Sequence, residues 1–254
     1  MLDFTILGSG TSTGVPLIGC DCPVCTSKDP KDNRLRTSLK IQSASTTIVI
    51  DTTPDFRYQM LRTKSTQLDA IVFTHPHRDH YAGLDDIRPF NYFSQKPMHI
   101  YANALTQVAI KRDFYYAFEE KKDAGLPEMI LHSIESAPFE IGDIQFNPIQ
   151  VMHREMPVLG FRIGALTYIT DANFISTEEQ AKIKGSKILI LNALRKEPHP
   201  THFNLEQAIA MAKSLEIPTV YFIHFSHQIG LYEEVEKVLP AGMHLAYDGL
   251  QFSM

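Results

Sequence analysis

A chain of 254 residues, 44% hydrophobic and 21% charged, is long enough to bury a sizeable core without disulfide or metal staples. Its formal net charge of −5 argues against a protein that binds many phosphates, so a stable nucleic-acid complex is not expected. The amino terminus lacks the pattern of a signal peptide, and no apolar run reaches the roughly 20 residues of a membrane span. We therefore expect a cytoplasmic protein without a membrane partner. The sequence does not decide between a monomer and a homodimer.

Strand-like and helical patterns alternate along the chain. Strands are predicted at residues 4–7, 38–42, 47–51, 70–73, 98–101, 144–151, 158–163, 167–170, 187–191 and 219–223, with a hairpin-like piece at 244–252. Helices are predicted at residues 55–62, 81–86, 104–118, 177–183, 205–215 and 232–238. Asn204 is a predicted N-cap, and the segment 92–141, mixed in charge, is expected to form a helical cap or surface insertion. This order suits two packed sheets with helices outside, in one domain spanning residues 1–254.

A glycine-rich stretch, residues 8–16, follows the first strand. Its third glycine comes one residue too late for a dinucleotide-binding fingerprint, and no helix pattern opens after it. We expect a tight loop that leads into Cys20, Cys22 and Cys25, which are all the cysteines of the chain. An odd number of thiols within six positions is no disulfide framework, but it supplies three corners of a tetrahedral zinc site. The fourth corner is offered by the segment 224–227, where His224 and His227, three residues apart, can serve two neighbouring metals.

The run 74–80, Thr-His-Pro-His-Arg-Asp-His, places three imidazoles and one carboxylate directly after the apolar segment 69–73. Imidazole and carboxylate groups mixed at a strand end predict a metal centre. Because alternate residues of an extended chain point the same way, His75 and His77 can share one metal. Asp79 and His80, in the following turn, would then face a second metal.

The H-x-H-x-D-H motif resembles the metallo-β-lactamase superfamily. The resemblance implies an α/β fold, the αββα four-layer sandwich, with two metals held between the edges of the two sheets. Further donors are expected downstream after strand-like segments, and the chain offers them. By resemblance, the first metal is held by His75, His77 and His153, the second by Asp79, His80 and His224, and both by Asp171. Asp51 is expected to orient one of these histidines.

The combination of C-x-C-x-x-C with the late H-x-x-H resembles PhnP-type phosphoribosyl cyclic phosphate phosphodiesterases, in which a structural zinc lies beside the catalytic pair. The resemblance implies Cys20, Cys22, Cys25 and His227 as ligands of this zinc. It also implies catalytic roles for Asp79 and for His202, the latter as general acid, with His199 as the competing choice. Arg88 is a candidate contact for substrate phosphate, although an exposed salt bridge is the usual role of an arginine.

Two metals of this kind can share a hydroxide that attacks phosphorus. We therefore expect a hydrolase acting on a small phosphodiester, such as a ribosyl cyclic phosphate, through a dinuclear metal-bound hydroxide. Its cofactors would be two divalent ions, zinc or manganese, and one structural zinc. One alternative is a tRNA-maturation endonuclease of the Z type, a class that generally carries a protruding basic arm. Another is a non-hydrolytic accessory protein of pyrroloquinoline quinone biosynthesis, which the complete donor set disfavours.

Overall fold

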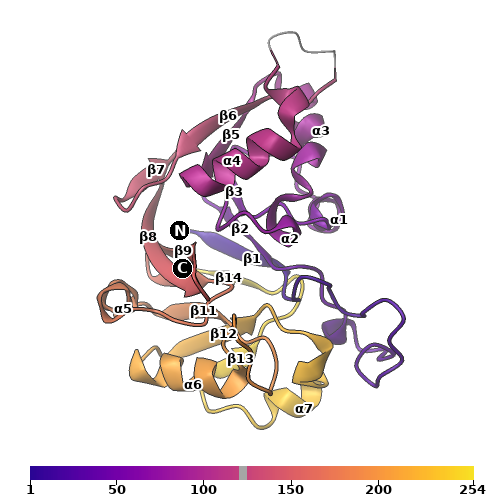
Figure 1. The fold of residues 1–254 in the computed structure, drawn as a ribbon, viewed down its shortest axis with the longest axis vertical. Helices are drawn as coiled ribbons and strands as arrows, with labels where there is room; N and C mark the ends of the chain where they lie inside the picture. The colour runs from indigo at the N-terminus through magenta and orange to yellow at the C-terminus, as the bar shows by residue number, and fades with distance from the viewer. Residues whose placement is uncertain (120–124) are drawn as a thin grey trace.

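Two sheets packed face to face form the centre of the molecule, and helices cover the outer face of each (Figure 1). The computed structural model describes residues 1–119 and 125–254. The strand order is β14-β1-β2-β3-β4-β5-β6 in the first sheet and β13-β12-β11-β10-β9-β8-β7 in the second. The predicted αββα four-layer sandwich is therefore confirmed. Within the described ranges, no helix is both long and apolar enough to cross a membrane.

The first sheet consists of β1 (Asp3–Gly8), β2 (Ser38–Gln42), β3 (Thr47–Ile50), β4 (Ala70–Val72), β5 (Met98–Ala102), β6 (Met129–Ser133) and β14 (Gln251–Ser253). The second consists of β7 (Phe139–Ile141), β8 (Ile144–His153), β9 (Met156–Ile163), β10 (Leu166–Ile169), β11 (Ile188–Asn192), β12 (Thr219–Ile223) and β13 (Met243–Leu245). The helices are α1 (Phe56–Arg62), α2 (Arg78–Tyr81), α3 (Arg88–Ser94), α4 (Ala104–Asp113), α5 (Thr177–Ile183), α6 (Leu205–Ser214) and α7 (Tyr232–Glu236). The short 3-10 helices in the described part of the chain are η1 (Pro30–Asp32), η2 (Leu84–Ile87), η3 (Tyr115–Ala117) and η4 (His227–Ile229).

Alternation along the central strands divides the buried apolar side chains among three cores. In β4, Ala70 and Val72 face the core between the sheets, whereas Ile71 faces the helices outside. In β11, Ile190 faces the core between the sheets and Leu189 faces the other helical layer. Successive side chains of a strand point to opposite faces. A four-layer fold covers both faces of each sheet, so it can bury strands that are apolar at every position.

In each sheet an antiparallel part continues into a parallel part, which runs β3-β4-β5-β6 in one sheet and β10-β11-β12-β13 in the other. The carboxyl ends of parallel strands lie at the same edge of a sheet, so residues that directly follow β4, β10 and β12 can converge. A hydrogen bond of 3.0 Å from the amide of Leu159 in β9 to the carbonyl of Thr74 joins the two sheets at this edge. This edge holds the candidate site.

Predictions for the central strands and most helices agree with the structure, while the sheet edges and the region around α2 differ. The predicted helix 81–86 is instead the pair α2 and η2, and α3, β6 and β7 were not predicted. The expectation that residues 92–141 form a cap or insertion is wrong for the described part, because β5 and β6 belong to the first sheet and β7 to the second. Part of that prediction, residues 120–124, lies outside the described residues. The N-cap Asn204 is confirmed, with a capping box to Gln207.

The predicted hairpin at residues 244–252 is also wrong. β13 pairs parallel with β12 in the second sheet, and β14 pairs antiparallel with β1 in the first. Between them the buried carboxylate of Asp248 accepts hydrogen bonds of 2.8 Å from the amides of Ser9 and Leu35 and pairs with Arg62 at 3.1 Å. These contacts hold the connecting chain where it crosses from one sheet to the other, so its two strands cannot pair with each other.

Gly83 lets the motif helix α2 pack directly on the chain that leaves β3. Its amide donates to the carbonyl of Thr52 at 2.9 Å, and an added Cβ would lie 2.0 Å from the carbonyl oxygen of Thr53. We expect Gly83→Ala to lower the free energy of unfolding by roughly 2–4 kcal/mol, because backbone must move to relieve this overlap. Urea denaturation measures the change.

Gly164→Ala is the matched control, because Gly164 has a φ of +58° and no atom within 4 Å of an added Cβ. Left-handed strain alone should cost about 1–2 kcal/mol there. Equal losses in the two variants would contradict the assigned overlap at Gly83.

Candidate metal centre

All seven predicted active-site donors come together at the edge where the parallel strands end. His75 lies three residues after β4, His153 is the last residue of β8, Asp171 lies two residues after β10, and His224 directly follows β12. The donor atoms fall into groups whose members lie within 4.8 Å of one another. These groups are Asp79, His80, Asp171 and His224; His75, His77 and Asp171; and His153, Asp171 and His202.

Asp171 belongs to all three groups, and its two carboxylate oxygens face different sets of histidines. Oδ1 lies 3.4 Å from Nε2 of His80 and 3.3 Å from Nε2 of His224. Oδ2 lies 3.7 Å from Nε2 of His75 and 3.2 Å from Nε2 of His202. A carboxylate with one oxygen toward each donor set has the geometry needed to bridge two cations.

The environment of the histidines fits a cation better than a hydrogen-bonded cluster. Among the described residues, Nε2 of His75, Nε2 of His80 and both ring nitrogens of His224 are buried without a hydrogen-bond partner. Buried polar atoms are nearly always paired, so this group of unpaired nitrogens around one carboxylate needs an explanation. Divalent cations held by imidazole nitrogen and carboxylate oxygen provide it.

Burial and neighbouring charge set the protonation of these groups. Burial, reinforced by the nearby His80, holds the pKa of His75 well below its ordinary value. Burial likewise lowers the pKa of His153 to about 4. Both side chains are thus neutral at pH 7, the form in which imidazole binds a metal. For Asp171, burial acts to raise the pKa, but His224 and His80 outweigh it and hold the pKa well below the usual carboxyl range.

Asp51 orients the motif from behind, as expected from the sequence. Its Oδ2 lies 2.7 Å from Nδ1 of His80 and accepts the hydroxyl of Thr74 at 2.8 Å, while its Oδ1 accepts the amide of Thr74 at 2.9 Å. The Thr74 hydroxyl also lies 2.9 Å from Nδ1 of His75. Contacts of this kind fix the ring orientation of a ligating histidine and leave Nε2 free to bind. The role of Thr74 was not predicted, and its one local signal in the sequence is its place directly before the motif.

Backbone strain gathers at the same edge. Asp51, Asp171 and His224 adopt φ values of 65°, 54° and 56°, in the left-handed region that non-glycine residues rarely occupy. Each follows a strand directly or within two residues. Strain of this kind persists where surrounding contacts fix the chain, and here it turns each side chain out of the strand toward the cluster. The glycine-rich loop also approaches as expected, because Gly10 bridges to Phe225 beside His224.

The loop that carries His199 and His202 reaches the same carboxylate. Nε2 of His202 lies 3.2 Å from Oδ2 of Asp171, whereas its Nδ1 lies 2.9 Å from the hydroxyl of Thr201. His199 is farther out, with Nδ1 3.1 Å from the same hydroxyl and 3.3 Å from Nδ1 of His202. Burial lowers the pKa of His202, although Asp171 opposes the shift. Of the two histidines, His202 is the one in contact with the donor cluster.

The three cysteines meet His227, and we call these four residues the knuckle. Nδ1 of His227 lies 3.4, 3.3 and 3.5 Å from the sulfurs of Cys20, Cys22 and Cys25. A tetrahedral zinc with ordinary bonds would separate nitrogen and sulfur by roughly 3.5 Å. A backbone hydrogen bond from Cys25, then His227, lowers the pKa of Cys22 to about 6. Burial raises the pKa of Cys25 to about 11, so it is the distances that fit a structural zinc.

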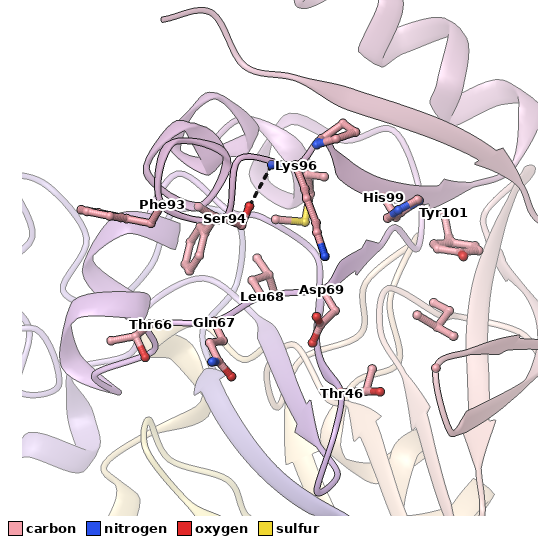
Figure 2. Close-up of a pocket in the computed structure, with 15 residues that line it drawn as sticks. Thr46, Thr66, Gln67, Leu68, Asp69, Phe93, Ser94, Lys96, His99 and Tyr101 are labelled. Carbon is pink, nitrogen blue, oxygen red and sulfur yellow. Dashed lines mark hydrogen bonds between the residues drawn. The ribbon is translucent and has the colours of Figure 1, made fainter.

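Two other features, the predicted phosphate contact Arg88 and a cavity, lie apart from the donors. Arg88 begins α3, where its guanidinium pairs with the side chain of Asp85 and donates to its carbonyl. A cavity of about 770 Å³, shown in Figure 2, is lined by Asp69, Lys96, His99 and Tyr101 among others. Its walls include residues that precede β3, β4 and β5, so it lies at the amino ends of these strands, opposite the metal-binding edge. None of the seven donors lines it.

Residues 46–225 match the family model described as the beta-lactamase superfamily domain. The chain belongs to the metallo-β-lactamase superfamily. Its fold and its cluster of histidines and aspartates support a metal-dependent hydrolase.

Two curated relatives match this chain over only part of their own length. A Porphyromonas gingivalis protein named octanoyltransferase is 39% identical over 249 residues, which cover 97% of this chain and 50% of that protein. Coenzyme PQQ synthesis protein B of Methylobacterium nodulans is 30% identical over 123 residues, covering 43% of this chain and 40% of that protein. The chain thus spans about half the length, or less, of these relatives.

Among solved structures, a crystal structure described as a new diphosphatase from the PhnP family superposes with a TM-score of 0.94 and 41% identity, covering 100% of this chain and 98% of that one. Zn(2+)-bound PqqB from Methylobacterium extorquens gives a TM-score of 0.82 at 19% identity, covering 99% and 100%. Human tRNase Z, short form, gives 0.70 at 18% identity, covering 99% and 98%. The last two likenesses show the shared fold alone.

Metal uptake by the Asp79, His80 and His224 group should release a proton. Burial acts to lower the pKa of His80, but Asp171, Asp79 and Asp51 outweigh it and raise the pKa well above its ordinary value. The metal-free protein therefore keeps His80 protonated at neutral pH, and a metal must displace this proton. Affinity should rise with pH, by about tenfold per unit for one proton, until the raised pKa is passed. Titration calorimetry in buffers of different ionisation enthalpy counts the protons released.

His80→Gln is the matched variant, since an amide has no proton to lose in this range. It should bind metal more weakly and with one fewer proton released. The assignment of this proton to His80 would be contradicted if the unmodified chain released no proton. It would also be contradicted if the variant released as many protons as the unmodified chain.

Proposed function

We propose that this chain is a dinuclear metal-dependent phosphodiesterase that opens cyclic phosphodiesters, such as a ribosyl cyclic phosphate, or hydrolyses small nucleotide-like phosphodiesters. One observation carries the proposal: the carboxylate of Asp171 turns one oxygen toward each donor set, and His202 contacts it at 3.2 Å. This arrangement supports two cation positions on either side of Asp171, with a histidine outside the predicted ligand set beside them. A two-metal mechanism of phosphodiester hydrolysis uses those three elements together.

His75, His77 and His153 would hold one ion, Asp79, His80 and His224 the other, and Asp171 both. When bound, zinc or manganese ions would lower the pKa of water and neutralise charge on the phosphate. The chain itself keeps the imidazoles oriented, through the contacts of Asp51 with His80 and of Thr74 with His75. Asp79 would serve in catalysis by helping to hold the second ion. The knuckle would hold a separate structural zinc.

His202 would supply the proton that an alkoxide leaving group requires. Its Nε2 faces the cluster, and its Nδ1 is held by Thr201, so one ring nitrogen points toward the reacting groups. A positioned acid of this kind matters most when the leaving group is basic. His199 has no such contact with Asp171 and is therefore the second choice.

A phosphoanhydride is the competing substrate class, because the structure at 41% identity and TM-score 0.94 is described as a diphosphatase. The octanoyltransferase relative raises acyl chemistry, but here every thiol faces His227 in the knuckle and none joins the donor cluster. Metal-reconstituted protein tested on cyclic and linear phosphodiesters, diphosphates, acyl thioesters and a tRNA precursor separates these classes. Turnover confined to any class other than phosphodiesters would overturn the proposal.

His202→Ala should leave metal content unchanged and slow the hydrolysis of alkyl phosphodiesters by about 10²–10⁴-fold. The rate on a nitrophenyl phosphodiester, whose leaving group needs no proton, should fall much less. Steady-state kinetics on both substrates, with metal analysis of each preparation, measures the difference.

His199→Ala is the matched control and should retain most of the activity on both substrates. Equal losses on the two substrates in His202→Ala would remove His202 from the acid role. A selective loss on alkyl substrates in His199→Ala would instead assign that role to His199.

A further inference from the structure

The loop at residues 195–203 runs between the donor cluster and the knuckle. It follows β11 and ends at Asn204, the N-cap of α6. His202 in this loop contacts Asp171. On the other side lies η4, whose first residue, His227, contacts the three cysteine sulfurs and whose second residue is Gln228.

Arg195 connects the two sides through all three nitrogens of its guanidinium. Nε donates to the carbonyl of Glu197 at 3.3 Å, and Nη2 donates to the carbonyl of Pro198 at 3.0 Å. Nη1 donates to Oε1 of Gln228 at 3.1 Å. The planar guanidinium presents donors in fixed directions, so it can hold two loop carbonyls and a side chain of η4 in one geometry. The carbonyl of Pro198 directly precedes His199 in the chain.

The start of this loop is held by α6: the amide of Leu205 donates to the carbonyl of Arg195 at 2.9 Å, and the side chain of Asn204 donates to the carbonyl of Lys196 at 3.1 Å. Lys196, Glu197 and Pro198 are exposed and contribute nothing to the apolar cores. The second part of the loop is held by Asn173, which donates to the carbonyl of Pro200 at 3.1 Å, and by buried Phe203. A segment with few buried contacts opens easily, so its position depends strongly on the hydrogen bonds that remain. For the carbonyls of Glu197 and Pro198 those are the bonds of Arg195.

We propose that Arg195 is a positioning residue that couples the knuckle to the loop bearing His202, through Gln228. The inference rests on the proposed function in one respect, the role of His202 as acid. The knuckle fixes His227, the adjacent Gln228 receives the guanidinium, and the guanidinium sets the course of the chain toward His202. The knuckle would then determine the placement of the acid as well as the stability of its own loop.

Hydrogen exchange tests the coupling without reference to activity. In metal-loaded protein, Arg195→Met and Gln228→Met should each speed amide exchange in peptides covering 196–203. Gln228→Glu keeps an acceptor for the guanidinium and should preserve the original exchange. Lys187→Met, a charge removal at the amino end of β11 and so far from the loop, should also leave it unchanged. Zinc analysis confirms that the knuckle stays loaded in every variant.

Kinetics supply the second readout. Arg195→Met and Gln228→Met should lower kcat on an alkyl phosphodiester by roughly tenfold to a hundredfold, the scale of a misplaced catalytic group, with KM little changed. The nitrophenyl substrate should be nearly unaffected. Because both variants break one contact chain, the double variant should be no slower than the slower single variant.

Unchanged exchange at 196–203 in Arg195→Met, or additive effects in the double variant, would overturn the coupling. Failure of the proposed function would give a different result. The loss of rate in His202→Ala would then be the same for the alkyl and the nitrophenyl substrate. In that case the exchange measurement still decides whether Arg195 joins the loop to the knuckle. Arg195→Lys, which keeps the charge but not the fork of donors, should give intermediate exchange and guards against a misfolded methionine variant.

Discussion

The buried carboxylate of Asp171 is the interaction on which the rest of the site depends. Four imidazole nitrogens lie between 3.2 and 3.7 Å from its two oxygens, and its own side chain is 2% exposed. Isolated in a protein interior, such a charge would be strongly unfavourable. Here it is surrounded by histidines delivered from both sheets, and this convergence is what the four-layer architecture achieves.

Strand direction explains how residues far apart in sequence reach one point. The parallel strands of both sheets end at the same edge, and left-handed backbone at Asp51, Asp171 and His224 turns each side chain out of its strand. Thr74 and Asp51 then hold the rings from behind. The knuckle stands beside this edge because His224 and His227 lie three residues apart on one short connection. Two metal-binding groups thus share a single stretch of backbone.

The sequence predicts the centre of this molecule well and its margins poorly. Central strands are apolar on both faces and followed by histidine or aspartate, so their type and the donors after them can be recognised without coordinates. The strands that were missed or misassigned, β6, β7, β13 and β14, all lie at sheet edges. Edge strands are half exposed, so their hydrophobic pattern is weak. The residues that connect two such strands look the same in the sequence whether the strands pair with each other or join different sheets. The contacts of Asp248 with Ser9 and Leu35, and of Arg195 with Gln228, join residues far apart in the sequence, and no local pattern predicts them.

The crossing of the chain between β13 and β14 has a consequence for how the protein assembles. These two strands, near the carboxyl-terminal end of the described chain, close the margins of opposite sheets, and β14 does so against β1 at the amino-terminal end. Neither layer is complete until this stretch has been synthesised. Pairings between the first and last parts of a chain form slowly because a very large loop must close first. Nascent protein on the ribosome would therefore expose an open margin of β1 until β14 has been synthesised, a period in which chaperones would be of greatest use.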